Sequence, residues 1–268
     1  MNNSCGFSAI LSDFLKNKIS TEYREKLFYQ IRKLMKIGVL SDIHGNHYAL
    51  TEVLKAATHE KVDRLLVLGD IVGYYYHPNK LLEQLNDWDY LLIKGNHEDI
   101  LLNIISGTIK ESVIRAKYGS GHQKAIEQLS KTQLETLCNA PERRMLEIDN
   151  IKILMCHGSP WSTDYYLYPD TQKKVLDKCE QPEIDIVLTG HSHHAFFYKA
   201  GRSILINAGS VGQNRNTGGL ASWALINTDN GSIQLKSTPY DVTQLIDEIE
   251  RMDPDNIYLK YILTRNRK

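Results

Sequence analysis

The chain has 268 residues, of which 42% are hydrophobic and 24% are charged. These fractions are ordinary for a globular protein and exclude an intrinsically disordered chain. The 32 basic residues balance the 32 acidic residues, so no global field attracts a long nucleic acid or an acidic membrane surface. The length fits one large α/β domain with appendages.

The cysteines and the lengths of the apolar segments indicate the cellular compartment of the protein. The four cysteines lack the spacing of metal ligands, and a chain of this size needs no disulfides. The first ten residues carry no basic secretion signal, and no segment approaches the ~20 apolar residues of a membrane span. We therefore expect a cytoplasmic protein without a membrane partner. Cys156, at the end of an apolar run, is expected to be a buried structural thiol.

Residues 1–35 differ in pattern from the rest of the chain. Glu22–Lys36 carries apolar residues at three- and four-residue spacing, namely Tyr23, Leu27, Ile31 and Leu34. This spacing predicts an amphipathic helix, and we place a helical extension at residues 1–35. A helix packed on the outside of the domain, a partner-binding helix and a segment upstream of a translation start at Met35 all fit the pattern.

From residue 36 the chain alternates between predicted strands and helices. The strands are expected at Ile37–Ser41, Arg64–Leu68 and Tyr90–Ile93, with helices near Tyr48–Glu60 and Asn79–Asn86. Alternation of this kind implies crossover connections between parallel strands. Residues 98–140 then show helical spacing with few breaks, which predicts a cap insertion of two or three helices.

The second half begins with short runs rich in β-forming residues. Met145–Ile148 and Ile151–Cys156 flank Asp149-Asn150, a plausible hairpin turn, and later runs joined by turn residues suggest antiparallel pairing. Residues 241–268 are expected to form closing helices packed on a domain that spans residues 36–240. The predicted fold is an α/β four-layer sandwich, with two mixed β-sheets face to face and helices outside.

Polar residues follow five apolar runs in a fixed order. They are Asp42-x-His44, Gly69-Asp70, Gly95-Asn96-His97, His157-Gly158 and Gly190-His191-x-His193. Residues at the carboxyl ends of strands form the binding sites of open α/β sheets. A pair of divalent metals needs a bridging carboxylate and further imidazole, amide or carboxylate ligands. The pattern therefore predicts a two-metal hydrolase in which Asp70 is placed to bridge.

This ordered set resembles that of the calcineurin-like metallophosphoesterase superfamily, over about Met35–Tyr240. In that family the same motifs build a dinuclear site on a β-sandwich flanked by helices. The resemblance implies that one ion is held by Asp42, His44, Asp70 and His193, and the other by Asp70, Asn96, His157 and His191. Mixed imidazole and carboxylate ligation suits two Mn, Fe, Zn or Ni ions more than Ca or Mg.

The resemblance also implies the reaction. A hydroxide that bridges the two ions attacks phosphorus in line, and Asp70 and His97 are the catalytic residues. By family analogy, His97 steadies the phosphoryl oxygen or protonates the leaving oxygen, and a pKa near neutrality suits either task. The implied substrate is a small phosphate ester, either a diester or a monoester, including nucleotide-derived esters.

Other segments indicate which branch of this family the sequence resembles. Asp70 is followed by Ile71-Val72-Gly73 rather than by the segment with a phosphate-binding Arg that is typical of protein phosphatases and dinucleoside tetraphosphatases. Gly69–Pro78 and Asn207–Gln213 instead look like the compact bacterial and archaeal phosphodiesterases, although Ala208 stands where Pro is usual. Glu98 also departs from the common Gly-Asn-His-Asp run.

Several residues are candidates for substrate contacts. They are Asn96, His97, Arg215 and Tyr74, with Tyr75, Tyr76 and Trp161 as possible stacking partners and the turn at Gly209–Gly212 as a source of N–H donors. The aromatic loop Ser159–Asp170 is a further candidate. The remaining histidines, His47, His59, His77, His122 and His194, have no position in the family pattern and are expected at the surface or behind the ligands.

Two other functions fit the same residues. One is a nuclease or nucleic-acid end-processing enzyme, although the neutral net charge disfavours an extended nucleic acid as partner. The other is a regulatory or scaffold protein that keeps the metals and uses the predicted helix at Glu22–Lys36 to bind a partner. The physiological substrate and the oligomeric state stay open.

Overall fold

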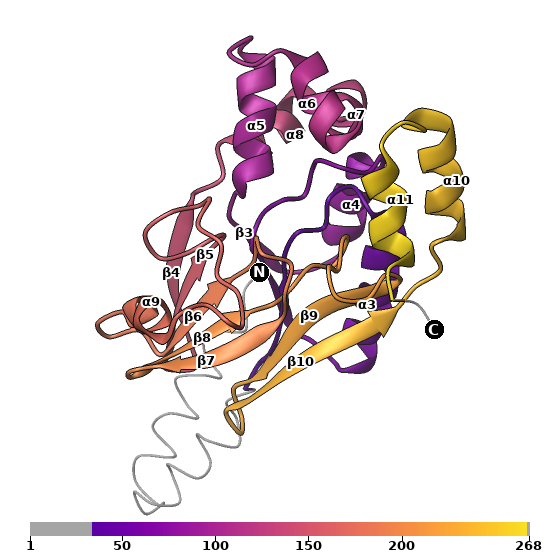
Figure 1. Ribbon diagram of the computed structural model, residues 1–268. Helices are drawn as coiled ribbons and strands as arrows, with labels where there is room; N and C mark the ends of the chain where they lie inside the picture. The colour runs from indigo at the N-terminus through magenta and orange to yellow at the C-terminus, as the bar shows by residue number, and fades with distance from the viewer. Residues whose placement is uncertain (1–33, 267–268) are drawn as a thin grey trace, which may run out of the picture. The chain divides into compact units, whose positions relative to one another are not determined.

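The computed structural model describes residues 34–266, in which one five-stranded sheet carries the first motifs (Figure 1). Its strand order is β10-β9-β1-β2-β3, with bounds Ser232–Pro239, Leu220–Asn227, Lys36–Leu40, Arg64–Val67 and Tyr90–Leu92. β1, β2 and β3 run parallel, whereas β9 pairs antiparallel with both β1 and β10. The predicted crossover units are therefore confirmed.

A second five-stranded sheet follows in the order β4-β5-β6-β8-β7. The bounds are Arg143–Ile148, Ile151–Cys156, Ile186–Thr189, Ser203–Asn207 and Phe196–Ala200. β4 and β5 form the predicted hairpin, and both turn residues, Asp149 and Asn150, adopt the positive φ that such a tight turn requires. β6 pairs parallel with β5 and β8, so beyond this hairpin the expected antiparallel pairing holds only for β7 with β8 in this sheet.

The two sheets pack face to face through alternating side chains. In β1, Ile37 and Val39 lie in the core between the sheets, while Leu40 joins the core on the opposite face. From the second sheet, Ile153 and Leu188 fill the same central core. Strands that are buried on both faces need nearly continuous apolar sequence, which is what these runs supply.

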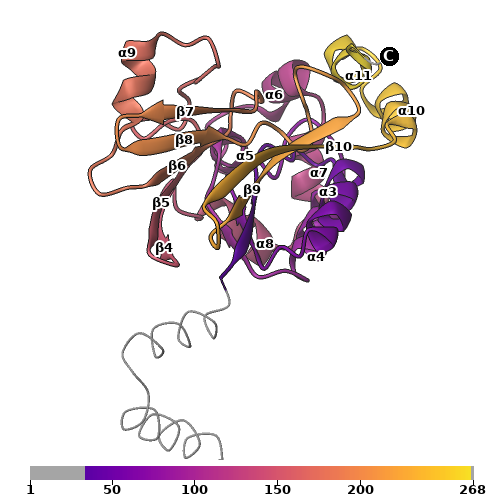
Figure 2. The same ribbon diagram turned by 90° about the horizontal axis from the view of Figure 1, so that it is seen from below.

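Helices cover the outer faces. Figure 2 shows α3 (His47–His59) and α4 (Pro78–Leu85) on one side of the sheets and the short α9 (Lys173–Leu176) on the other, followed by the 3-10 turn η1 (Asp177–Cys179). The predicted four-layer α/β sandwich is thus confirmed, and Cys156 is buried as expected. No helix within residues 34–266 is long and apolar enough to cross a membrane.

The cap consists of four helices, more than the two or three expected. They are α5 (Asn96–Ile105), α6 (Glu111–Tyr118), α7 (Gly121–Gln128) and α8 (Lys131–Cys138), grouped at the top of Figure 1. The additional break lies at Ser130, whose hydroxyl caps α8 by accepting from Gln133 N while the Gln133 side chain accepts from Ser130 N. This reciprocal capping box begins a new helix where the sequence shows no glycine.

The chain closes with α10 (Thr243–Met252) and α11 (Ile257–Thr264), in agreement with the expected C-terminal helices. The amphipathic helix predicted at Glu22–Lys36 lies mostly outside the described residues. Its last predicted residue, Lys36, already belongs to β1.

A half-buried cluster of polar side chains fixes α10 to the sandwich. Glu248 of α10 lies 2.8 Å from His77 Nε2 and accepts a hydrogen bond of 2.9 Å from the Tyr48 hydroxyl. Burial alone would raise the pKa of Glu248, but the hydrogen bond and charge of His77 lower it below its usual range. The ionised carboxylate therefore stabilises the folded state.

We predict that Glu248→Gln lowers the free energy of unfolding by about 1–2 kcal/mol near neutral pH. Because the pKa of Glu248 is lower in the folded chain, this contribution is fully present above the unfolded pKa of about 4.3 and is lost as pH falls from there through the folded pKa. Denaturant unfolding at pH 7 and pH 3 measures the effect. Glu250→Gln, at an exposed ion pair on the same helix, is the control, and an equal loss in both variants or at both pH values contradicts the assignment.

Candidate metal centre

The predicted ligands all lie just beyond the carboxyl ends of strands. Asp42 and His44 follow β1, Asp70 follows β2, and Asn96 begins α5 after β3. In the second sheet, His157 follows β5 directly, and His191 and His193 follow β6. The loops are joined by backbone hydrogen bonds, such as Ile43 N and His44 N to Asp70 O at 2.9 Å each. The structure thus brings the seven predicted ligands to one place.

Left-handed backbone geometry aims these side chains. Eleven non-glycine residues among residues 34–266 have positive φ, and five of them are predicted ligands with φ between 53° and 62°: Asp42, His44, Asp70, His191 and His193. Each such residue costs on the order of 1–3 kcal/mol, so it persists only where the surroundings impose it. Because Asp42 and His44 both adopt this conformation, their side chains can point toward the same place although they are two residues apart.

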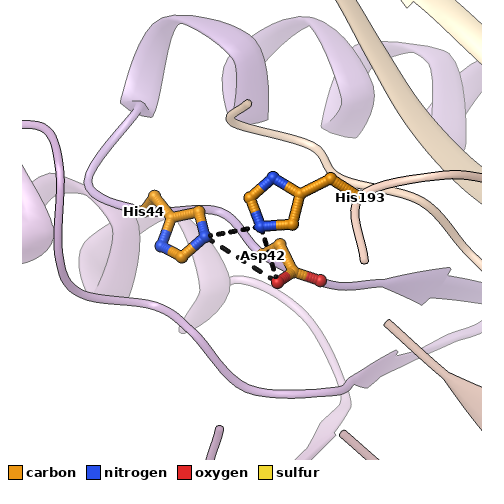
Figure 3. A group of neighbouring side chains, drawn as sticks. All are labelled: Asp42, His44 and His193. Carbon is orange, nitrogen blue, oxygen red and sulfur yellow. Dashed lines mark hydrogen bonds and ion pairs between the residues drawn. The ribbon is translucent and has the colours of Figure 1, made fainter. Parts of the chain in front are cut away.

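One group of side chains combines the first and last motifs (Figure 3). His193 Nε2 lies 3.1 Å from Asp42 Oδ1 and 3.2 Å from His44 Nε2, and His44 Nε2 lies 3.7 Å from Asp42 Oδ1. The other oxygen, Asp42 Oδ2, accepts hydrogen bonds from Ser41 Oγ and His191 N. Asp42 Oδ1 is therefore the oxygen left to face the histidines.

A second group lies beside the first and includes the bridging candidate. Asp70, His157 and His191 have ligand atoms within 4.8 Å of one another. Asp70 Oδ2 lies 3.3 Å from His157 Nε2 and 3.7 Å from His44 Nε2, so it faces both groups. Asn96 Oδ1 lies 3.1 Å from His157 Nε2.

The protonation of the rings fits a metal centre. The Nδ1 atoms of His44, His157 and His193 lie 2.7–3.0 Å from backbone carbonyl oxygens. Since a carbonyl only accepts, each Nδ1 carries the proton, and the Nε2 lone pairs of His44 and His193 face each other at 3.2 Å. Asp42 Oδ1 and His191 Nε2 have no hydrogen-bond partner within the described chain. Cations bound within the two groups would give these atoms a partner.

The pKa values follow from burial and the two carboxylates. Burial lowers the pKa of His44 well below its usual range and that of His191 to about 3. Burial alone would raise the pKa of Asp42, but the neighbouring histidines hold it well below its usual range. Burial would also lower the pKa of His157, whereas the Asp70 and Asp42 carboxylates raise it to about 10. A bound cation must replace that proton, because a metal ligand is unprotonated.

Glu98 organises the centre, although the sequence pattern assigned it no role. Its buried carboxylate accepts hydrogen bonds from Asp70 N at 2.8 Å and Gly95 N at 2.7 Å, and from Ile71 N and Val72 N at 2.8 and 3.2 Å. Burial and the charge of Asp70 raise the pKa of Glu98 to about 7. Glu98 stands where Asp is common after Gly-Asn-His, and this departure could have drawn attention to Glu98 from the sequence alone.

His97, in the first turn of α5, lies between the metal ligands and the other cap helices. Its backbone N–H donates to Asp70 Oδ1 at 2.8 Å, and its ring centroid lies 4.8 Å from that of His44 and 5.0 Å from that of Tyr74. Burial lowers its pKa well below the near-neutral value expected from the sequence. The neutral ring still carries one N–H to donate.

Arg215 is a cation at the edge of the centre. It forms no ion pair with a carboxylate among residues 34–266, and its Nε atom is buried without a hydrogen-bond partner there. Burial alone would lower the pKa of Arg215, but Tyr258, Tyr74 and Tyr166 together with Asp42 raise it. The guanidinium is therefore charged and lies close to the centre, where it can bind an anion.

The structure corrects two of the expected substrate contacts. Tyr75 and Tyr76 are 0% and 1% exposed, so they belong to the core and cannot stack on a substrate. The turn at Gly209–Gly212 also offers few donors, because Val211 N and Gly212 N bond to the carbonyl oxygens of the Ser41–Asp42 loop. The turn therefore supports that loop. Both errors arise from pairings between residues far apart in sequence.

Other aromatic residues surround the centre instead. Tyr166, in the aromatic loop Ser159–Asp170, lies with its ring centroid 3.9 Å from that of His191 and is 43% exposed. Trp161 in the same loop packs on Tyr165. Of the histidines outside the family pattern, His122 is the one whose ring contacts a predicted site residue, His97, in the described part of the chain.

The fold and the site define a metal-dependent α/β hydrolase. Residues 35–231 match the model of the calcineurin-like phosphoesterase superfamily domain, and the chain belongs to this family. The chain is therefore a phosphoesterase with histidine and aspartate clusters suited to metals. A relative, an uncharacterized protein of Methanocaldococcus jannaschii, is 29% identical over 232 residues, or 80% of this chain and 91% of that protein.

Solved structures share the fold. A hypothetical protein from Pyrococcus horikoshii has a TM-score of 0.74 at 20% identity, covering 87% of this chain and 99% of that one. A metallophosphoesterase from Sphaerobacter thermophilus has a TM-score of 0.67 at 22% identity, with 82% and 94% coverage. These similarities confirm the predicted architecture.

We predict that Glu98→Gln weakens Mn²⁺ binding by about 10- to 100-fold, because the loops that carry Asp70 and Asn96 lose two of four anchoring bonds. Titration calorimetry measures the affinity. Asp99→Asn removes the same charge from the next residue of α5, which pairs with Lys94 instead, and is expected to bind Mn²⁺ normally. Unchanged affinity in the Glu98 variant contradicts this role.

Proposed function

We propose that the chain hydrolyses small phosphate esters at a centre of two divalent cations. One is held by Asp42, His44, Asp70 and His193, and the other by Asp70, Asn96, His157 and His191. The observation that carries this proposal is the position of Asp70 Oδ2, 3.7 Å from His44 Nε2 and 3.3 Å from His157 Nε2, between two clusters of potential ligands. Imidazole, carboxylate and amide donors favour Mn, Fe, Zn or Ni.

The cations and the residues around them would each contribute to hydrolysis of the ester. Divalent cations, when bound, lower the pKa of a water molecule and screen the charge of the phosphate. The ring N–H of His97 is placed beside the ligands to donate to a phosphoryl or leaving-group oxygen. Its Nδ1 has no hydrogen-bond partner among residues 34–266, so the ring is available for this contact.

Arg215 is proposed to bind the nonbridging oxygens of the ester. No Arg follows Asp70, so the phosphate-binding cation of the protein phosphatases is missing from its usual segment. Arg215 enters from the loop after β8 and supplies a charged guanidinium close to Tyr74 and Tyr166, with no carboxylate partner among residues 34–266. A planar guanidinium can bind two phosphate oxygens at once. Its single positive charge suits a small ester better than a polyanion.

The metal dependence is tested on bis(p-nitrophenyl) phosphate. We predict that chelation abolishes turnover and that Mn²⁺ or Ni²⁺ restores it, with two ions bound per chain by equilibrium dialysis. Asp70→Asn is expected to lower kcat by about 100-fold or more, because the shared ligand loses its charge. Asp255→Asn, at an exposed position, is the control. Undiminished hydrolysis by the Asp70 variant contradicts the proposal.

The role of Arg215 predicts a defect in substrate binding. Arg215→Gln is expected to lower kcat/KM by about 10- to 100-fold, chiefly by raising KM, because the ester loses a charge-assisted contact. Metal content by dialysis is expected to stay the same. Arg202→Gln, at an exposed position between β7 and β8, is the matched control. An unaltered KM in the Arg215 variant would place the guanidinium outside the substrate site.

A further inference from the structure

His122 is a buried cap residue that contacts His97. It lies in the first turn of α7 and is 1% exposed, and neither ring nitrogen forms a hydrogen bond of good geometry within residues 34–266. Burial lowers the pKa of His122 to about 4, and an interaction of the ring with the backbone of His97 opposes this lowering. Its ring is nearly parallel to that of His97, with centroids 5.1 Å apart and an angle of 11° between the planes. An apolar ring would fill this place without burying two polar atoms.

The other neighbours of the His97 ring lie at different angles. His44 and Tyr118 each meet it at 69°, and Tyr74 lies at 35°, with centroids 4.8–5.0 Å away. Gly73 makes room for the ring, because a Cβ there would lie 2.2 Å from His97 Nδ1. The parallel contact with His122 therefore restricts rotation of the His97 ring plane.

Contacts with the site and with the C-terminal helices fix the start of α7, and with it the contact between His122 and His97. A Cβ on Gly121, the residue before His122, would lie 2.6 Å from the backbone of Gly73 and Tyr74, so α7 touches the loop that follows Asp70. Asp253 Oδ2, at the end of α10, accepts hydrogen bonds from Ser120 N at 2.9 Å and Ser120 Oγ at 2.7 Å. The start of α7 is thus tied both to the site and to the C-terminal helices.

We propose that His122 is a positioning residue that holds the imidazole of His97 in the orientation needed for phosphate ester hydrolysis. This inference rests on the proposed function, in which His97 donates to the substrate. His122 acts through the ring of His97 and contacts no metal ligand directly. Helix α7 of the cap thereby becomes part of the active site.

The kinetic test combines variants of both histidines. His122→Ala is expected to lower kcat on bis(p-nitrophenyl) phosphate by about 10-fold, with KM and metal content unchanged, because a small displacement of a catalytic group slows the reaction. His122→Phe keeps a ring to stack and is expected to recover most of the loss. In a His97→Ala background, His122→Ala is expected to have no further effect. His59→Ala, at the exposed end of α3, is the control.

A second readout does not depend on turnover. The imidazole NMR signals of His97 in the metal-free protein, assigned with His97→Ala, are expected to shift in His122→Ala and to stay close to their original positions in His59→Ala. Additive losses in the double variant, no recovery with Phe, or unmoved His97 signals each overturn the positioning role. If the unaltered chain shows no metal-restored hydrolysis, the proposed function itself fails, and this inference fails with it.

Discussion

The burial of two carboxylates among four imidazoles is the constraint on which the rest of the structure depends. Asp42 and Asp70 are 0% and 1% exposed, and no solvent screens their charges. Buried charges are costly unless paired. Here His157 pairs with both carboxylates, while the Nε2 lone pairs of His44 and His193 also point inward. The centre is therefore stable only with positive charge inside it, supplied by a proton or by cations.

These groups are held together by ligand loops with strained backbone, which hydrogen bonds to Glu98 support. The ligand loops adopt left-handed backbone at five positions, and Glu98 compensates by anchoring four backbone N–H groups around Asp70 and Gly95. Gly95 must be glycine, because a Cβ there would lie 2.2 Å from Asp70 Oδ1. The sequence motifs are thus part of a hydrogen-bond network that extends from the first sheet to α5.

The sequence predicted those parts of the molecule that depend on neighbours along the chain. Apolar runs and the turns after them located the strands, and the order of the motifs identified the family. Contacts across long separations were missed, because a pattern does not reveal which loops meet. Glu98 bonds to Ile71, and Tyr75 faces the core rather than the substrate. His122 reaches His97 only through the packing of the cap, and the raised pKa of Arg215 depends on tyrosines from three separate segments.

Anomalous diffraction from crystals of the Mn²⁺-loaded protein tests the central claim most directly. The account predicts two peaks on opposite sides of the Asp70 carboxylate. One is expected beside Asp42, His44 and His193, and the other beside Asn96, His157 and His191. A single peak, or peaks that Asp70 does not contact, would contradict it.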